Sequence, residues 1–168
     1  MNIWFENTVK YVKMDENGHE KRATETYLLD AISFTESEAR IYKELQSMVS
    51  GEFTVTKIAR TNISEIIPSD SGDRWYKAKV SFITVDEESG KEKRVATPVL
   101  VFANSVDEAD KTVKDAMQGM MADFEITAIV ESKILDVFPF DGAEKVIPSN
   151  LKQVEYFLAE QTADNDEE

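Results

Sequence analysis

The chain has 168 residues, of which 42% are hydrophobic, and it carries a formal net charge of −14. A field of this sign opposes general binding to nucleic acids or anionic membranes, and the absence of cysteine excludes disulfides and thiolate metal sites. No apolar run approaches the roughly 18 residues that span a bilayer, and the N-terminal residues lack the pattern of a signal peptide, so we expect a cytoplasmic protein.

The sequence contains a long internal repeat. A segment from Trp4 to Pro68 recurs, shifted by about 71 positions, from Trp75 to Pro139. The matched stretches include Trp4-Phe5 with Trp75-Tyr76, Glu20-Lys21-Arg22 with Glu92-Lys93-Arg94, Phe53-Thr54-Val55-Thr56 with Phe124-Glu125-Ile126-Thr127, and Ile66-Ile67-Pro68 with Val137-Phe138-Pro139. Duplication of a unit this long predicts two copies of one supersecondary motif.

Each copy opens with an alternating stretch that is typical of a half-buried strand. The residues expected to face inward are Phe5, Asn7, Val9 and Tyr11 in the first copy, and Tyr76, Ala78, Val80 and Phe82 in the second. Asn17-Gly18 favours a type I′ hairpin turn, and return strands are expected at 22–32 and 94–103. Pro98 has no N–H to donate, which places the second return strand near an edge or at a bulge.

A helix should follow in each copy, because Thr35-Glu36-Ser37-Glu38 and Ser105-Val106-Asp107-Glu108 both match the S/T-x-x-E capping box. The apolar helix faces are expected to be Ala39, Tyr42, Leu45 and Val49 in the first copy, and Ala109, Val113, Ala116, Met117 and Met120 in the second. Long third strands are expected at 53–66 and 124–137.

These elements predict an α+β fold: a tandem duplication of a ββαβ unit with a mainly antiparallel sheet, plus a C-terminal helix. We expect residues 1–72 and 73–140 to form the two repeats of one pseudo-symmetric domain. Residues 141–161 should contain a linker and the C-terminal helix, and residues 162–168 read as a disordered acidic tail.

The sequence lacks a recognisable catalytic constellation. Its one histidine, His19, follows the Asn17-Gly18 turn and has no neighbouring nucleophile, so it is expected to be a solvated hairpin-tip residue. Phosphate-binding glycine loops and metal-binding motifs are missing as well. We therefore expect no enzyme activity, no cofactor and no metal ion.

The best candidate for a binding site is the outward face of the first strands, where both tryptophans lie among cations. Aromatic faces with interleaved cations bind unstacked bases. This alternative would use Trp4, Lys10, Lys21, Arg22, Arg74, Trp75, Lys77, Lys79, Lys93 and Arg94. The competing interpretation is that each tryptophan packs at the junction between the copies.

Several stretches of the chain, in order, resemble a domain-of-unknown-function family (DUF4494-like) of gut Bacteroidetes and crAss-like phages. The resemblance covers residues 3 to about 140 and rests on Trp4-Phe5, Ser33-Phe34-Thr35-Glu36-Ser37-Glu38-Ala39-Arg40, Gly51-Glu52-Phe53-Thr54-Val55-Thr56, Gly72-Asp73-Arg74-Trp75-Tyr76 and Asp136-Val137-Phe138-Pro139. It implies a bacterial or phage protein of the host cytoplasm, and it implies no catalytic residue.

The leading functional hypothesis is a non-enzymatic binding or adaptor protein that acts through protein–protein contacts, with another protein or as a homodimer. The first alternative is a single-stranded nucleic-acid accessory that uses the tryptophan and cation set. The second alternative is an acidic DNA mimic that occupies a nucleic-acid enzyme, a role that the charge of −14 would fit.

Overall fold

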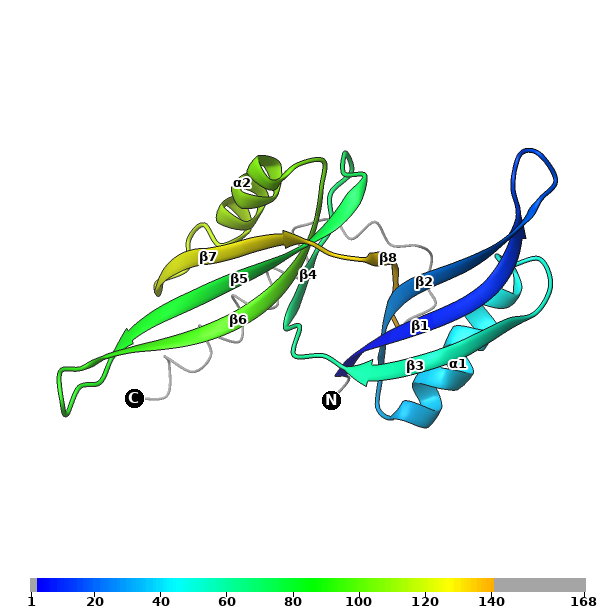
Figure 1. The fold of residues 1–168 in the computed structure, drawn as a ribbon. Helices are drawn as coiled ribbons and strands as arrows, with labels where there is room; N and C mark the ends of the chain where they lie inside the picture. Colours follow the sequence, from blue (N-terminus) through cyan, green and yellow to red (C-terminus); the bar gives the residue numbers. More distant parts are fainter. Residues whose placement is uncertain (1–2, 141–168) are drawn as a thin grey trace. The chain divides into compact units, whose positions relative to one another are not determined.

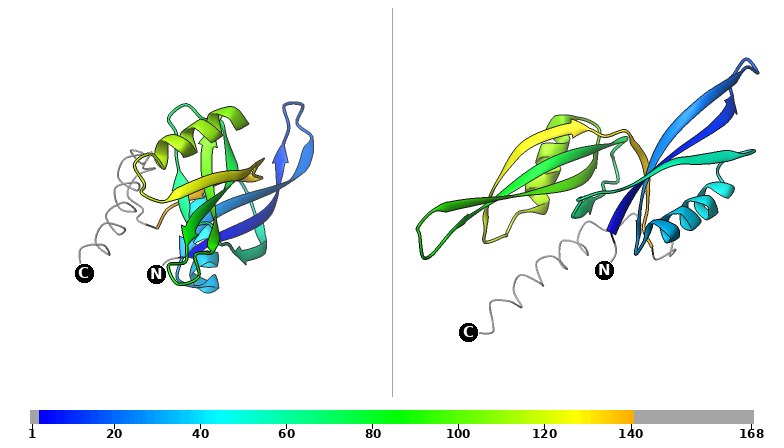
Figure 2. Two further views of the ribbon diagram at one scale, coloured as in Figure 1. Left: turned by 90° about the vertical axis from the view of Figure 1, so that its left-hand side faces the viewer. Right: turned by 60° about the horizontal axis from the view of Figure 1, so that its bottom comes forward.

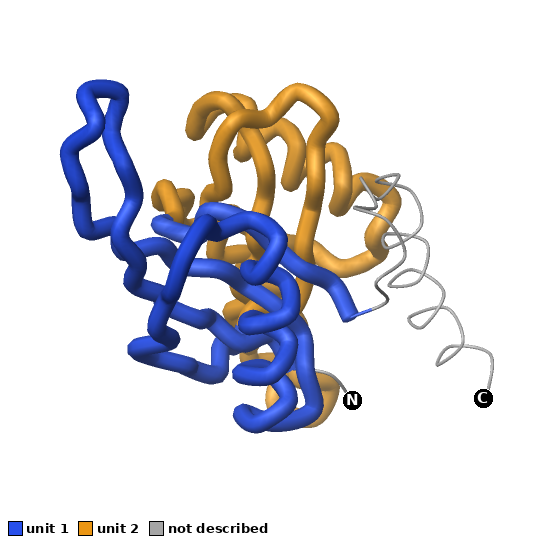
Figure 3. The backbone as a smooth tube through the Cα atoms, turned by 90° about the vertical axis from the view of Figure 1, so that its right-hand side faces the viewer, with its two compact units in different colours: residues 1–62, 133–145 blue, residues 63–132, 146–168 orange. Residues whose placement is uncertain are grey.

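Two four-stranded, mainly antiparallel sheets make up the fold, and each carries one α-helix on one face (Figure 1). The structure is a computed structural model that describes residues 3–140. Within this range, residues 3–62 and 133–140 form unit 1, and residues 63–132 form unit 2 (Figure 3). The predicted α+β class with mainly antiparallel sheets is confirmed. The predicted C-terminal helix and acidic tail lie outside the described residues.

Unit 1 contains a sheet with the strand order β3-β1-β2-β8. Its elements are β1 Ile3–Met14, β2 Glu20–Ala31, α1 Phe34–Gln46, β3 Phe53–Arg60 and β8 Ile134–Phe138. The strand β1 pairs antiparallel with both β2 and β3, whereas β8 pairs parallel with the outer side of β2.

Unit 2 contains a sheet with the strand order β4-β6-β5-β7. Its elements are β4 Glu65–Ile67, β5 Arg74–Val85, β6 Glu92–Ala103, α2 Val106–Ala116 and β7 Asp123–Glu131. The strand β5 pairs antiparallel with β6 and β7, and β4 pairs parallel with β6. The pairing pattern of unit 1 is thus repeated.

The repeat extends to local irregularities of the backbone. The pairing of β1 with β3 shifts register between Thr8 and Val9, and the pairing of β5 with β7 shifts at the equivalent place, between Lys79 and Val80. Thr56 and Thr127 are the extra residues of these bulges, and their hydroxyls donate to the carbonyls of Thr8 at 3.2 Å and Lys79 at 3.3 Å. This agreement supports duplication of one folded motif.

The predicted long third strands are wrong, because each is broken into two strands that belong to different units. The strand β4 follows β3 in sequence but joins the sheet of unit 2, and β8 follows β7 but joins the sheet of unit 1. The compact units therefore differ from the sequence repeats 1–72 and 73–140. The predicted single pseudo-symmetric domain stays a prediction.

Chain length explains why β8 leaves the sheet that contains β7. Only Ser132 and Lys133 separate β7 from β8, so Glu131 and Ile134 are at most about 10 Å apart. The open side of β6 lies three strand spacings from β7, or about 14 Å. The strand β8 therefore cannot reach the fourth position of the sheet that contains β7.

Hydrogen bonds from Arg40 hold the end of β8 in unit 1. Arg40 of α1 donates to the carbonyl of Asp30, to that of Phe138 at 3.3 Å and to that of Pro139 at 3.1 Å. Its guanidinium carbon also lies 5.1 Å from the centroid of the Phe140 ring, a cation–π distance. Arg40 thus ties the exchanged strand to the helix and to β2.

A different set of contacts anchors the segment that follows β4 in unit 2. Asn104 donates to the Ser71 carbonyl at 2.5 Å, and the Ser71 hydroxyl lies 3.4 Å from the Glu108 carboxylate. A Cβ built on Gly72 would lie 2.7 Å from the backbone nitrogen of Ala103, which leaves no room for a side chain at this position.

The sequence predicted the first residues of α2 correctly and those of α1 wrongly. Ser105 caps α2 and accepts from the Glu108 N–H at 3.1 Å, as predicted. In α1 the cap is Ser33, which accepts from the Glu36 N–H at 3.1 Å, so the box predicted at Thr35 is wrong. The helix begins earlier, and its buried residues become Ser37, Ile41 and Leu45, whereas Ala39 and Tyr42 are exposed.

The tight hairpin turn predicted at Asn17-Gly18 is also wrong. The Gly18 N–H donates to the Asp15 carbonyl at 3.0 Å, and the Asp15 N–H donates to the His19 carbonyl at 2.9 Å. Gly18 is therefore the last residue of the turn, with φ +79°, in a longer loop with a glycine bulge.

The prediction for Pro98 agrees with the structure. Pro98 lies where β6 becomes an edge, because β4 pairs with β6 only from Val99 onward.

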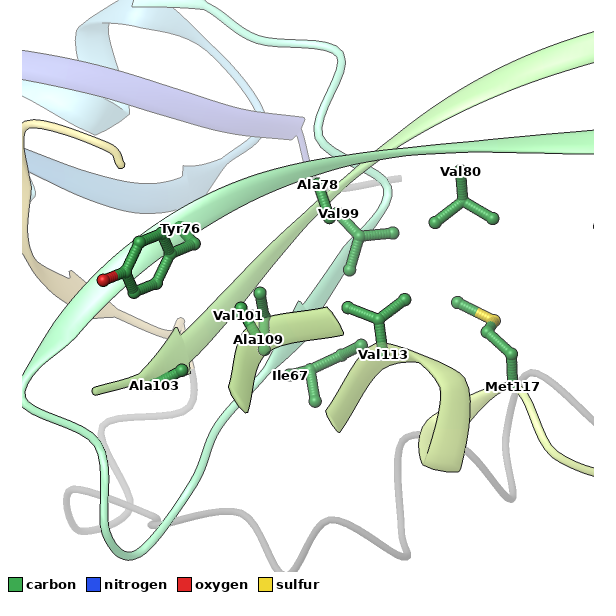
Figure 4. Close-up of a cluster of buried hydrophobic side chains, with 10 residues drawn as sticks. All are labelled: Ile67, Tyr76, Ala78, Val80, Val99, Val101, Ala103, Ala109, Val113 and Met117. Carbon is green, nitrogen blue, oxygen red and sulfur yellow. The ribbon is translucent and has the colours of Figure 1, made fainter. Parts of the chain in front are cut away.

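Each unit has its own core between the helix and one face of the sheet. In unit 2 the core contains Ile67, Tyr76, Ala78, Val80, Val99, Val101, Ala103, Ala109, Val113 and Met117 (Figure 4). In unit 1 it contains Phe5, Val9, Tyr27, Leu29, Ala31, Ile41, Leu45 and Phe138. The inward strand faces predicted from alternation are confirmed, with Tyr11 and Phe82 half-buried at their ends.

One polar pair distinguishes the two cores. Asn7 and Ser37 are fully buried in unit 1, and the Ser37 hydroxyl donates to the Asn7 Oδ1 at 3.1 Å. The equivalent residues of unit 2 are Ala78 and Ala109, which are also fully buried. Asn7, the misfit of the predicted inward face, is therefore hydrogen-bonded, as a buried amide requires.

We expect the Asn7 and Ser37 substitutions to be strongly coupled. Asn7→Ala alone leaves a buried hydroxyl unsatisfied and should lower the free energy of unfolding by about 1–3 kcal/mol. The double variant Asn7→Ala/Ser37→Ala reproduces the pair of unit 2 and should cost about 1 kcal/mol less than the sum of the single variants. Urea unfolding of the four proteins measures this coupling, and strict additivity would contradict it.

The exchange of strands predicts an effect at long range in the sequence. Phe138 is buried in unit 1, where its ring stacks on Tyr27 with 5.5 Å between the centroids. Phe138→Ala should therefore destabilise unit 1 by about 3 kcal/mol. Hydrogen exchange should accelerate in β1 and β2 more than in β5 and β6.

Leu135→Ala is the control for this experiment, because Leu135 lies in the same strand and is 56% exposed. Faster exchange mainly in β5 and β6 of the Phe138→Ala variant would contradict the assignment of β8 to unit 1.

Candidate functional site

The hairpins β1–β2 and β5–β6 extend as two-stranded arms beyond the rest of their sheets (Figure 2). The pairing of β3 with β1 stops at Tyr11, and the pairing of β7 with β5 stops at Ile83. On the other side of the hairpins, β8 reaches only Thr26 and β4 only Val99. The distal parts of both hairpins therefore have no neighbouring strand at either edge.

The first arm carries cations and exposed apolar side chains on the face opposite the helix. Val12 is 48% exposed and Met14 is 65% exposed. The register places Arg22 opposite Val12, Glu20 opposite Met14, and Lys57 of β3 opposite Thr8. We define the first arm face as Lys10, Val12, Met14, Glu20, Arg22 and Lys57.

The cations of the first arm face are available for a partner. Among residues 3–140, no carboxylate lies within 4 Å of the charged groups of Lys10, Arg22 or Lys57. Three cations and one anion leave this face with a net charge of +2. This is a locally basic surface on a chain whose net charge is −14.

The second arm presents an acidic version of the same face. Val85 is 64% exposed and Ile83 is half-buried. Arg94 bridges two carboxylates, with 3.1 Å to Glu92 and 2.7 Å to Glu125. We define the second arm face as Ile83, Val85, Glu92, Arg94, Asp123 and Glu125, and its charged residues sum to −2.

The two tryptophans of the predicted nucleic-acid set do not form an exposed aromatic pair. Trp75 is 8% exposed, and its ring centroid lies 4.8 Å from that of Phe102, its neighbour across the strands. Trp4 is half-buried. Both face away from the helices, as predicted, but Trp75 offers little of its ring for a base to stack on.

The predicted cations are divided between the two faces of the sheets. Lys10, Arg22, Lys77, Lys79 and Arg94 lie on the side of the tryptophans, opposite the helices. Lys21, Arg74 and Lys93 lie on the other side. The sequence thus grouped residues that the structure separates.

Two of the three cations on the helix side of the sheets form ion pairs with carboxylates. Arg74 contacts Asp73 at 3.0 Å and Glu131 at 3.8 Å, and hydrogen bonding to Asp73 raises the pKa of Arg74. Lys21 lies 3.5 Å from Asp15. These ion pairs reduce the positive charge that a phosphate would meet.

His19 lies at the exposed tip of the first arm, in agreement with the sequence interpretation. The side chain of His19 is 77% exposed, and its Nδ1 lies 3.6 Å from the Asp15 carboxylate. The backbone N–H of His19 donates to that carboxylate at 2.8 Å and lowers the pKa of Asp15. The carboxylate therefore organises the loop.

Sequence analysis missed a cluster of three polar side chains in unit 1. The Tyr11 hydroxyl donates to Glu25 Oε1 at 2.7 Å, and the Tyr27 hydroxyl donates to Glu25 Oε2 at 2.6 Å. Burial and the bond to Glu25 raise the pKa of Tyr11 to about 12 and also raise the pKa of Tyr27. Both phenols therefore stay protonated at neutral pH, which suits a structural hydrogen bond better than proton transfer.

Glu65 is the one carboxyl group among the described residues whose pKa rises strongly. It begins the short strand β4 opposite Val99, and burial raises the pKa of Glu65 to about 7. Within the described part of the chain, no hydrogen bond or ion pair to its carboxylate accompanies this burial. The ionised form is therefore disfavoured in the folded protein.

This shift predicts a pH-dependent stability. Because the folded pKa of Glu65 lies above its ordinary value of 4.5, the contribution of Glu65 to stability is fully present below pH 4.5 and is lost as the pH rises from there through about 7. Glu65→Gln removes this loss. Because the group is partly solvated, we expect the variant to gain only about 1 kcal/mol over the natural protein at pH 8 and almost nothing at pH 5.

Chemical denaturation at both pH values measures this difference. Glu87→Gln is the control, because Glu87 is an exposed residue of the β5–β6 loop. An equal gain at pH 5 and pH 8 would show that the effect does not come from ionisation of Glu65.

The residues of the arm faces that the sequence did not indicate are Val12, Met14, Glu20, Lys57, Ile83, Val85, Glu92, Asp123 and Glu125. A signal for Val12 and Met14 was present, because they continue the outward alternation of Trp4 and Lys10. The signal for Lys57 and Asp123 was absent, because it depends on where β3 and β7 end along their neighbours.

Two kinds of site are not found among the described residues, a metal-binding cluster and a membrane-spanning helix. No group of three or more His, Cys, Asp or Glu residues within 3–140 is placed to hold a metal ion. Over the same range, neither helix is long and apolar enough to cross a membrane.

Comparison with known proteins places the chain in a family. No protein with curated function matches its sequence. A family model described as Domain of unknown function (DUF4494) matches residues 3–140, which include every strand and helix described above. The chain therefore belongs to the DUF4494 family.

Proposed function

We propose that this protein is a non-enzymatic binding or adaptor protein that acts through protein–protein contacts, and that the first arm face is its contact surface. The observation that carries the proposal is the combination on one uncovered face of Val12 and Met14, 48% and 65% exposed, with cations that no carboxylate neutralises among the described residues. Exposed apolar groups beside charges are typical of protein interfaces.

The edges of the sheets favour contact through side chains over addition of a strand. The outer strands β3 and β7 each contain a bulge, which bends the edge away from a regular ladder. The repeated Glu-Lys-Arg stretches at 20–22 and 92–94 line the outer sides of β2 and β6 beyond β8 and β4. Bulges and edge charges are both devices that oppose strand pairing.

The charge of the first arm face indicates the chemistry of its partner. Lys10, Arg22 and Lys57 would attract a surface with Asp or Glu, and Val12 and Met14 would pack against apolar side chains between them. Methionine adapts to partners of different shapes, because its side chain is unbranched and polarisable. The partner we propose is therefore an acidic surface with exposed apolar residues.

A second candidate function is binding of single-stranded nucleic acid. The observation in its favour is that Lys77 and Lys79 are exposed on the face of β5 that also carries Trp75. Burial of Trp75 speaks against base stacking. Titration with a short oligonucleotide at low salt, followed by tryptophan fluorescence, separates the two functions, because this candidate requires quenching that the variant Lys77→Ala/Lys79→Ala loses.

The third candidate, a DNA mimic, rests on the net charge of −14 alone. It requires tight capture of a basic nucleic-acid enzyme and no binding to nucleic acid. The cellular setting that we propose for all three functions is the cytoplasm of a bacterial host, with the gene carried by the bacterium or by its phage.

The protein-binding proposal predicts the outcome of a peptide selection. Peptides selected from a random displayed library on the full chain should combine Asp or Glu with apolar residues. Their affinity, measured by fluorescence anisotropy, should fall about tenfold in the variant Val12→Ser/Met14→Ser, because the apolar centre of the face is lost.

The matched control is Met48→Ser/Met121→Ser, which removes two other side chains that are 51% and 96% exposed. If the selected peptides bind the arm variant and the natural protein equally, the first arm face is not the contact surface. Hydrolysis or transfer of any substrate that a single side-chain change abolishes would contradict the non-enzymatic role.

A further inference from the structure

The two arm faces of this chain are complementary in charge. The first face, as defined above, has a net charge of +2 and the second a net charge of −2, and both lie on equivalent hairpins of the two repeats. Three differences between equivalent positions contribute to the contrast: Lys10 corresponds to Ser81, Lys57 to Ala128, and Thr54 to Glu125. The fourth unit of charge comes from Asp123, which pairs with Ile83, whereas its equivalent Glu52 precedes β3. The register places Lys10 opposite Thr54, and Ser81 opposite Glu125.

The apolar residues of the two faces also correspond. Val12 and Met14 of the first face match Ile83 and Val85 of the second. Val12, Met14 and Val85 lie beyond the residues that pair with a third strand, and Ile83 lies at the last residue of β5 that pairs with β7. Each face therefore combines two apolar residues with charged residues, and the net charges of the two faces are opposite in sign.

We propose that a second copy of this chain docks its second arm face onto the first arm face. This inference rests on the proposed function and names the partner of the same surface. The second arm face has the chemistry that the first requires, since Glu92 lies opposite exposed Val85, and Asp123 and Glu125 lie opposite Ile83 and Ser81. Because the contact joins two unlike faces, it is a heterologous contact between copies.

Salt should weaken this association. The attraction acts between solvent-exposed charges, which ions screen within about 8 Å at physiological ionic strength. Light scattering after size-exclusion chromatography should show a mass that rises with protein concentration. The dissociation constant should increase about tenfold or more between low and high salt.

Charge reversal tests which faces meet. Lys10→Glu/Arg22→Glu changes the first face from +2 to −2, and Glu92→Lys/Asp123→Lys changes the second from −2 to +2 while keeping the contact between Arg94 and Glu125. Each variant alone should associate at least about tenfold more weakly than the natural protein, because like charges then face each other.

An equimolar mixture of the two variants should associate again, because the reversed first face of one meets the reversed second face of the other. The controls are Lys43→Glu/Lys111→Glu and Glu38→Lys/Asp115→Lys, which reverse exposed charges of the two helices, outside both faces, and should leave association unchanged. Circular dichroism and thermal unfolding of every variant show that loss of association is not loss of fold.

Three results would overturn the inference. One is a natural protein that stays monomeric at every concentration in low salt. Another is an equimolar mixture of the two variants that fails to associate. The third is an equal effect of the control variants.

These results leave the proposed function separately testable. If the chain stays monomeric but the selected acidic peptides still bind through Val12 and Met14, the first arm face binds a different protein. If neither the second copy nor the peptides bind, both proposals fail.

Discussion

The short connection between β7 and β8 is the constraint on which the rest of the structure depends. With two residues between β7 and β8, the chain cannot carry β8 across its own sheet, and so β8 completes the sheet of unit 1. The strand β4, which begins four residues after β3 ends, completes the sheet of unit 2. Each four-stranded sheet therefore needs a segment from both repeats, and duplication of the sequence supplies the missing strand within one chain.

The same topology decides which surfaces are available for binding. Exchanged strands of three and five residues cover only the proximal halves of β2 and β6, and so the distal hairpins extend as two-stranded arms. Bulges and charges oppose pairing along the strand edges. The uncovered arm faces remain, and their side chains have diverged between the repeats into a basic and an acidic surface.

Much of the fold was predictable from the sequence, because it depends on local patterns. Alternation identified the buried residues of β1 and β5, and Ser105 identified the start of α2. The same pattern was misleading at α1, where Ser37 is buried and its hydroxyl donates to Asn7 of a distant strand. The candidate site was predicted in part: Lys10, Arg22 and Arg94 lie on the arm faces, but alternation could not show that Trp75 is covered or that Arg94 is held between Glu92 and Glu125.

The sequence by itself determined that this protein is a duplicated α+β chain with two hairpins and two capped helices, since these features follow from periods of 2 and 3.6 residues and from turn and cap chemistry. Tertiary structure alone decided which sheet receives β4 and β8, which cations stay unpaired, and that Glu65 is desolvated. These properties depend on contacts between residues up to about a hundred positions apart, such as Arg40 with Phe138, and no local pattern encodes them.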